Sequence, residues 1–294
     1  MSGRRILEEE FEKNKELKKE DFQNLKDWYA CQDHLPPISD ELLVSLYHSC
    51  FYKLEPTKRT IENYFSMRTH GRELFSERDP CTVNVRNGKV VMLCSFLSKR
   101  TPENHRVLLM KIMNTDPAMY VFSEVTKAFN MHYDLELYLN GTAPGDEMVI
   151  DMDGISLGHL ARLNLVAAKK ILEYMQEGMP VRLKRLHYIN VVPFMDKIMA
   201  LIRPFMNKEF MEKLVFHTEG IESLDKFVPL KIMPKNYGGS EKSNEELAEE
   251  QLKFIMQYKD WFQEEEKLRV DESKRPIKSK SFGMDGSFKK IEFD

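Results

Sequence analysis

The chain has 294 residues, of which 42% are apolar, and its formal net charge is −3. A chain of this length and composition can bury a large core, either as one large domain or as two ordinary ones. The near-balanced charge excludes the domain-wide basic excess that nucleic-acid-binding proteins carry, so we expect no nucleic-acid partner.

The cellular compartment is predicted from the absence of membrane-spanning, secretion and disulfide signals in the sequence. No run of 18 apolar residues occurs, and residues 1–13 are charged, unlike the basic and then apolar start of a secretion signal. Cys31, Cys50, Cys81 and Cys94 show neither CxxC pairing nor the spacing of metal ligands. We therefore expect a soluble cytoplasmic protein with free thiols and with no cofactor or metal.

The first part of the chain predicts helices only. Residues 6–34 place apolar side chains among dense charges, which is typical of one or two amphipathic helices. Ser39 can cap a helix over 40–50, and Pro56 begins another helix that ends near Gly71. Residues 1–78 are therefore predicted to form an all-helical N-terminal domain.

The pattern changes near residue 79, where β-branched residues become frequent. Two short strands, 82–85 and 90–94, flank Asn87-Gly88, a sequence typical of a two-residue hairpin turn. A long helix is then predicted from Asp116 to about residue 139.

Residues 148–192 predict a strand, a turn, an amphipathic helix and a second strand, which is a βαβ unit and implies a parallel sheet. One face of this unit is rich in Met and Leu, and Met side chains adapt readily to different apolar neighbours. Composition and periodicity leave open whether this face is closed core or the wall of a ligand cavity.

The remaining elements are helical. An apolar-faced helix follows Pro193 and should bend or divide near Arg203, because Pro204 removes a backbone hydrogen bond. A charged helix is predicted within 241–268, after a second domain that spans 79–240. Residues 269–294 form a basic segment that we expect to be loosely attached.

Two motifs suggest chemistry. Residues 154–158 read G-x-S-x-G, so Ser156 could be a hydrolase nucleophile, with His187 or His217 as base and Asp196 as acid. Too few βα units surround Ser156 to build a hydrolase of that fold, and no HGGG-type loop is present. Asp151 and Asp153 resemble a metal pair, but capping and solvation of a turn explain such a pair more often.

Several segments together resemble the CRAL-TRIO lipid-transfer family, over roughly residues 15–265. The resemblance rests on their order and spacing: residues 46–68, 150–156, 167–190, 201–214 and 234–239. It implies an α/β fold in which an N-terminal helical bundle precedes a lipid-binding domain. In that domain a mostly parallel sheet forms the floor of a cavity, and a movable helix, here 192–214, covers the mouth as a gate.

The resemblance also implies site residues. The positions that match or adjoin the family's cavity, including the gate, are Val125, Ala128, Phe129, His132, Ile150, Ile171, Tyr174, Met175, Met179, Val181, Leu183, Leu186, Phe194, Met195, Ile198, Ile202 and Met206. The family's phosphoinositide groove maps onto Arg182, Lys184 and Lys213, with Lys208 beside them. His48, Cys50 and Glu209 stand where the family has basic residues.

These implications predict a non-enzymatic, monomeric carrier. It would enclose one hydrophobic small molecule of the tocopherol, retinoid, carotenoid or other isoprenoid class and transfer it between membranes that it meets transiently. Two alternatives stay open: a phosphoinositide-binding regulatory or scaffold module, and a serine hydrolase that uses Ser156.

Overall fold

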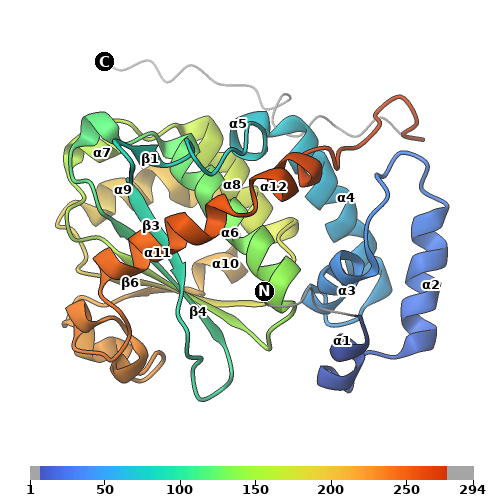
Figure 1. Ribbon diagram of the computed structural model, residues 1–294, viewed down its shortest axis with the longest axis horizontal. Helices are drawn as coiled ribbons and strands as arrows, with labels where there is room; N and C mark the ends of the chain where they lie inside the picture. The colour runs from blue at the N-terminus through green and yellow to red at the C-terminus, as the bar shows by residue number, and fades with distance from the viewer. Residues whose placement is uncertain (1–6, 277–294) are drawn as a thin grey trace.

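The computed structural model describes residues 7–276. The molecule has a group of helices on one side and, on the other side, a sheet covered by further helices (Figure 1). Its α-helices are α1 (Leu7–Lys13), α2 (Lys19–Ala30), α3 (Asp40–Ser49), α4 (Leu54–His70), α5 (Arg72–Phe75), α6 (Phe122–Asn140), α7 (Leu157–Leu160), α8 (Leu165–Glu177), α9 (Met195–Ile202), α10 (Lys208–Met211), α11 (Asn244–Met256) and α12 (Lys259–Glu265).

The strands and the short 3-10 helices lie between these helices. The strands are β1 (Val85–Arg86), β2 (Lys89–Val90), β3 (Met92–Phe96), β4 (Arg106–Ile112), β5 (Asp146–Asp151), β6 (Leu183–Ile189) and β7 (Leu214–Phe216). The 3-10 helices are η1 (Pro117–Met119), η2 (Arg203–Phe205), η3 (Ile221–Leu224), η4 (Leu230–Ile232) and η5 (Lys235–Tyr237).

The N-terminal part is all-helical, as predicted. The Ser39 hydroxyl accepts a hydrogen bond from the backbone N–H of Leu42 at 3.3 Å and so caps α3. Leu25, Leu46 and Ile61 from α2, α3 and α4 are fully buried. This packing of three helix faces supplies most of the apolar burial that holds the N-terminal helices together.

The main sheet has five strands in the order β3-β4-β5-β6-β7. β3 and β4 are antiparallel, and every other neighbouring pair is parallel. The predicted βαβ unit is therefore confirmed as β5, α8 and β6, with Val149 paired to His187 in register. The predicted turn is present between β1 and β2, where Asn87 (φ 50°) and Gly88 (φ 73°) supply the positive φ angles. The predicted strands were wrong in extent: β1 and β2 have two residues each, and residues 92–94 belong to β3, which pairs with β4.

The long helix starts later than predicted. Asp116 accepts a hydrogen bond from the backbone N–H of Ala118 at 2.9 Å and caps η1 instead. Tyr120 and Val121 are extended, and α6 begins at Phe122. The capping signal at Asp116 was correct, but the turn it begins does not continue.

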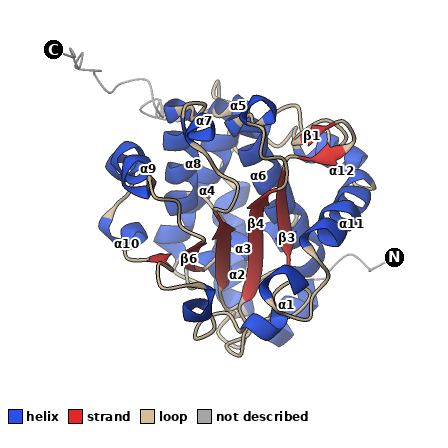
Figure 2. Cartoon of the chain, turned by 90° about the vertical axis from the view of Figure 1, so that its left-hand side faces the viewer, coloured by secondary structure: helices blue, strands red, loops and turns tan. Residues whose placement is uncertain are grey.

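The two faces of the sheet bury different partners, because alternate side chains of a strand point to opposite faces. Leu93, Leu109 and Val149 pack with η3, η4 and α11. Met92, Leu108 and Met148 pack with α6, α8 and the N-terminal helices. Figure 2 shows α6 and α8 behind the strands of the sheet.

Four buried charges connect the N-terminal helices to the rest of the chain. Arg68 of α4 contacts Asp134 of α6 at 2.5 Å and Glu265 of α12 at 2.6 Å, and Arg78 contacts the same two carboxylates. All four side chains are at most 8% exposed. Each arginine thus bridges both carboxylates, which keeps any one of these charges from lying unpaired in the interior.

Residues 269–276, the first part of the segment predicted to be loosely attached, pack against the N-terminal helices. Val270 is buried, the Arg269 guanidinium donates to the Phe75 carbonyl at 2.6 Å, and Arg275 pairs with Glu62 at 2.6 Å. Periodicity gave no sign of this contact, because it depends on individual side chains. Residues 277–294 of that segment lie outside the described residues.

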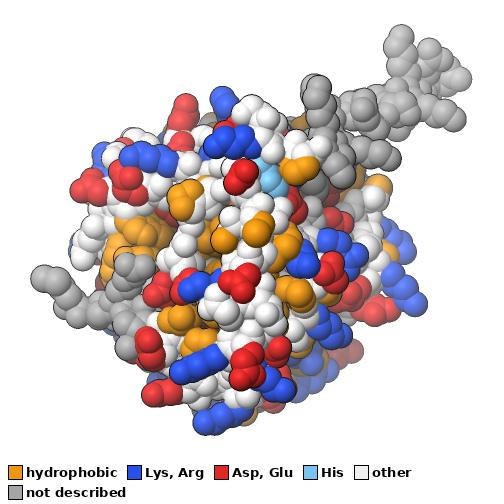
Figure 3. All heavy atoms as spheres, turned by 90° about the vertical axis from the view of Figure 1, so that its right-hand side faces the viewer, with side chains coloured by type: hydrophobic (Ala, Val, Ile, Leu, Met, Phe, Trp, Pro, Cys, Tyr) orange, Lys and Arg blue, Asp and Glu red, His pale blue; other side chains and the backbone are white. Residues whose placement is uncertain are grey.

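The surface gives no sign of a broad basic face on the side that Figure 3 shows, where charges of both signs alternate with small hydrophobic groups. Within residues 7–276, no helix is both long and apolar enough to cross a bilayer.

Candidate functional site

An apolar cavity lies on the sheet face that carries α6 and α8. Its volume is about 240 Å³, and helix α9 forms one wall. The residues that line it are Met92, Ile112, Tyr120, Phe122, Ile150, Met152, Ile155, His159, Leu160, Leu163, Ala168, Ile171, Leu172, Tyr188, Ile198 and Ile202.

The sheet side of this cavity follows from strand register. Met92 pairs directly with Ile112 across the antiparallel β3 and β4, and Ile150 pairs with Tyr188 across the parallel β5 and β6. Partners in register point to the same face, so these four side chains form one apolar floor.

Helix α8 supplies the opposite wall. The Asn164 side chain accepts hydrogen bonds from the backbone N–H groups of Val166 and Ala167, which fixes the start of the helix. Ala168, Ile171 and Leu172 then follow at spacings of three and four residues and face the cavity together.

Helix α9 closes the site from outside. Ile198 and Ile202, four residues apart, face the cavity, whereas Leu201 is 39% exposed on the outer side. The helix ends at Ile202 and η2 follows, which confirms the predicted break before Pro204. None of the side chains of Met195–Ile202 forms a hydrogen bond or ion pair with another described residue, so α9 itself packs through apolar contacts. The segment after it is tied to α8 by Gln176, which donates to the Phe205 carbonyl at 2.9 Å and accepts the Asn207 N–H at 2.8 Å.

No charged side chain lines the cavity; its polar groups are two phenols and one imidazole. Burial raises the pKa of Tyr120 and of Tyr188 to about 12. Burial, and then the positive charge of Arg162, lower the pKa of His159. All three groups are therefore neutral near pH 7, and the cavity suits an uncharged guest, because an ion there would find no counter-charge.

Ile150, Ile171, Ile198 and Ile202 are the predicted cavity residues that the structure brings together around this space. Four others belong to the hydrophobic core beside it: Val125, Phe129, Leu186 and Met206. Phe194 and Met195, at the start of α9, pack in a small cluster with Met152 and Val192 that shares Ile155, Tyr188 and Ile198 with the cavity lining.

Other predicted residues lie elsewhere. Tyr174 packs edge-on against Phe75 of the N-terminal part, with ring centroids 5.0 Å apart, because that side of α8 faces α4 and α5. Met175, Met179, Val181 and Leu183 line an outer groove and not the apolar cavity, because they lie at the end of α8 and the start of β6.

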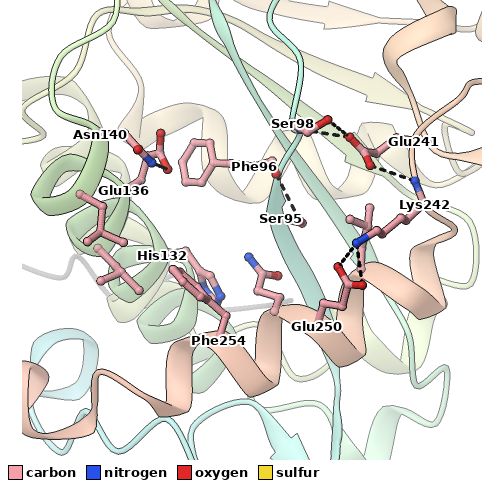
Figure 4. A pocket seen from close by; sticks show the side chains of 14 residues that line it. Ser95, Phe96, Ser98, His132, Glu136, Asn140, Glu241, Lys242, Glu250 and Phe254 are labelled. Atoms are coloured by element: carbon pink, nitrogen blue, oxygen red, sulfur yellow. Dashed lines mark hydrogen bonds and ion pairs between the residues drawn. The ribbon is translucent and has the colours of Figure 1, made fainter. Parts of the chain in front are cut away.

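Ala128 and His132 also face away from the cavity. They lie on the side of α6 that packs against α11, where His132 lines a second pocket of about 480 Å³ with Phe96, Glu250 and Phe254 (Figure 4). Ala128 packs with Ile255 of α11 in the same region. Helix α6 is buried on several sides, so an apolar spacing alone does not say which side faces the sheet.

Twelve of the lining residues are not among the predicted cavity residues, although Met152 and Leu160 lie on the Met- and Leu-rich face of the predicted βαβ unit. For those on strands a signal existed: Met92, Ile112 and Tyr188 lie on the same face as Ile150 once the strands are paired. For Tyr120, Phe122 and His159 no such signal existed. Tyr120 lies in the extended link before α6, Phe122 is the first residue of α6, and His159 lies on the one-turn helix α7.

The outer groove gathers most of the predicted basic residues. Arg182, Lys184 and Lys213 line it together with Arg59, and its volume is about 630 Å³. Arg182 donates to the carbonyl of His48 at 2.8 Å and lies over the ring of Phe51, 4.2 Å from its centroid. Lys208 does not line the groove and has an 88% exposed side chain.

The G-x-S-x-G turn forms a helix cap. Ser156 Oγ lies 2.9 Å from His159 Nδ1, but the same nitrogen also accepts the backbone N–H of Ser156 at 3.0 Å. His159 Nε2 has no hydrogen-bond partner among residues 7–276, so no carboxylate orients the ring as a catalytic triad requires. His187 instead bonds Glu147 and His217, at 3.1 and 3.0 Å.

The aspartate pair is structural as well. Asp151 contacts Lys111 at 2.8 Å and accepts hydrogen bonds from Asn190 at 2.8 Å and Tyr237 at 2.7 Å. Within the described part of the chain, no three His, Cys, Asp or Glu side chains are placed to hold a metal ion.

The comparisons with known proteins place the chain in a family. Residues 91–239 match the CRAL/TRIO domain model and residues 14–85 match the Pinta-like UBA domain model. The chain therefore belongs to the CRAL/TRIO family of lipid-binding proteins, as the order of its motifs predicted.

The alpha-tocopherol transfer protein-like protein of Homo sapiens is 25% identical over 240 residues, which are 79% of this chain and 68% of that protein. Clavesin-1 of Rattus norvegicus is 18% identical over 238 residues, 79% of this chain and 66% of that protein. The crystal structure of Sfh5 aligns with a TM-score of 0.49 at 16% identity, over 83% of this chain and 99% of that chain.

Proposed function

We propose that this protein is a carrier that binds one uncharged hydrophobic small molecule in the cavity under α9 and transfers it between membranes. The uncharged apolar lining carries this proposal. The guest would belong to the tocopherol, retinoid, carotenoid or other isoprenoid class, and the protein would perform no chemistry on it. Burial of apolar surface, at about 25 cal/mol per Å², would make escape into water slow.

Helix α9 is the element that would open. Its side chains make only apolar contacts, and Pro204 ends it after eight residues. A volume of about 240 Å³ is below the roughly 300–1,000 Å³ of typical ligand pockets, so binding would require outward movement of α9 or adjustment of Met92 and Met152.

The outer groove would bind an anionic headgroup while the guest leaves. Arg59, Arg182, Lys184 and Lys213 supply its positive charge, and Glu177 and Glu209 reduce it. Each basic residue near an anionic membrane contributes about 1 kcal/mol to association. We propose transient contact of a cytoplasmic monomer with such membranes; recruitment of a partner by phosphoinositide alone is the second function that this groove supports.

Transfer between vesicles tests the proposal. Donor vesicles carry fluorescent tocopherol or retinol, and acceptor vesicles contain a quencher with or without phosphoinositide. A carrier speeds the loss of fluorescence, and Arg182→Ala reduces the effect only for acceptors with phosphoinositide. If the protein binds phosphoinositide vesicles but speeds neither transfer, the carrier proposal fails and the regulatory module is favoured.

A further inference from the structure

His159 is the one polar side chain of the cavity lining that has an unpaired buried nitrogen among the described residues. It lies on α7, directly after the turn that follows β5, and is 4% exposed. The Tyr120 ring packs edge-on against it, with centroids 5.3 Å apart, and restricts the orientation of the imidazole.

The hydrogen bonds of His159 determine which nitrogen carries the proton. Nδ1 lies 3.0 Å from the backbone N–H of Ser156, and a backbone N–H can only donate. Nδ1 must therefore be an unprotonated acceptor. In a neutral imidazole the single proton is then on Nε2, so Nε2 is an N–H donor.

That donor has no acceptor. Nε2 is buried and makes no hydrogen bond with any residue in 7–276. A buried unpaired donor is costly, and neither Tyr120 nor Tyr188, the other polar side chains of the lining, accepts a hydrogen bond from it. In this structure Nε2 is covered, so a guest would reach it only when the surrounding side chains move to admit the guest, and an oxygen of that guest could then supply the missing acceptor.

We propose that the Nε2–H of His159 donates a hydrogen bond to an oxygen atom of the guest, so that the cavity selects uncharged lipids with a hydroxyl or carbonyl group over pure hydrocarbons. This inference rests on the carrier function proposed above and specifies its ligand. A hydrocarbon guest of the same size leaves the N–H unpaired. An anionic lipid is disfavoured because no cation lines the cavity.

The test compares an alcohol with the corresponding hydrocarbon. Farnesol and farnesene each displace retinol, whose fluorescence reports its binding, and the ratio of their affinities is measured for each protein. The same two probes are used throughout, so the difference in their solubility in water cancels between proteins. The ratio of farnesol to farnesene affinity should be about 10-fold lower in His159→Phe than in wild type, and this ratio defines the preference.

Two further variants serve as controls. His132→Phe removes a histidine whose Nε2 is also buried and unpaired but which lies outside the cavity, and it should keep the preference. His159→Gln keeps a donor at the site and an acceptor for the Ser156 N–H, so it should keep most of the preference even if His159→Phe folds poorly.

Nitrogen NMR of histidine-labelled protein gives an independent measurement. The His159 signals, assigned by their loss in His159→Gln, should show the Nε2–H form and should shift with farnesol but not with farnesene.

The outcomes separate the two proposals. If neither probe nor retinol binds to wild type, the carrier function fails and the inference fails with it. If all of them bind and the preference is the same in wild type and His159→Phe, or His159 is in the Nδ1–H form, the inference alone is overturned.

Discussion

Filling the cavity should abolish guest binding without unfolding the protein. Ala168 lies on α8 with its side chain in the cavity wall and is 2% exposed. In Ala168→Phe an aromatic ring would enter the space that we assign to the guest. A cavity that accommodates a benzene ring measures about 150 Å³, so the ring would occupy more than half of the volume of about 240 Å³.

The loss of affinity can be estimated from the carbons displaced. A phenyl ring takes the place of about six carbon atoms of the guest, and each buried CH₂ contributes about 0.8 kcal/mol. The expected loss is therefore about 5 kcal/mol, which is more than a thousandfold in Kd. Ala168→Leu, a smaller addition, should give an intermediate loss.

The assay is titration of retinol or fluorescent tocopherol, with thermal unfolding followed in parallel. Val166→Phe adds the same ring to the same helix at a position that is 54% exposed, and it should bind like wild type. Native unfolding together with wild-type affinity in Ala168→Phe would show that the guest does not occupy this cavity.

Three further predictions concern the gate, the buried charges and pH. Ile198→Asp places a charge on the inner side of α9 and should abolish ligand retention while leaving the fold intact, whereas Leu201→Asp on the outer side should not. Asp134→Asn removes one carboxylate from between two buried arginines and should lower the free energy of unfolding in urea by about 3–5 kcal/mol. As a control, Glu264→Gln removes a carboxylate from an exposed ion pair and should change that free energy by less than about 1 kcal/mol. Burial lowers the pKa of His132 from 6.5 to about 4, so between these pH values the unfolded chain binds more protons than the folded protein. The free energy of unfolding should therefore fall as the pH drops from about 6.5 to about 4, and it should fall less steeply in His132→Phe.

Each of these predictions has a result that contradicts it. Unchanged retention in Ile198→Asp would remove α9 from the role of a gate. A change below about 1 kcal/mol in Asp134→Asn would mean that the interior tolerates the unpaired arginines. Identical pH profiles of urea unfolding for wild type and His132→Phe would show that folding does not lower the pKa of His132.

The sequence predicted the parts of the fold that depend on local patterns. Alternation in residues 148–192 and the capping residue Ser39 act over a few residues, and both predictions are confirmed. The order of the motifs identified the family, which no single motif could have done.

The sequence could not predict features that depend on which side of an element faces which neighbour. Helix α6 packs against the sheet through Phe129 and against α11 through Ala128, and both sides are apolar. The pairing of Arg68 with Glu265 joins residues far apart in the chain, and charge patterning does not reveal such contacts. The unpaired Nε2–H of His159 could be inferred only from the structure, because the Ser156 N–H that bonds Nδ1 determines which ring nitrogen carries the proton.

Native mass spectrometry of the full chain, purified without detergent from eukaryotic cells, tests the central claim most directly. We predict one uncharged oxygen-containing lipid per chain in wild type and in Val166→Phe, and none in Ala168→Phe. Absence of lipid from all three proteins, or equal occupancy in all three, would contradict a carrier that holds its guest in the cavity under α9.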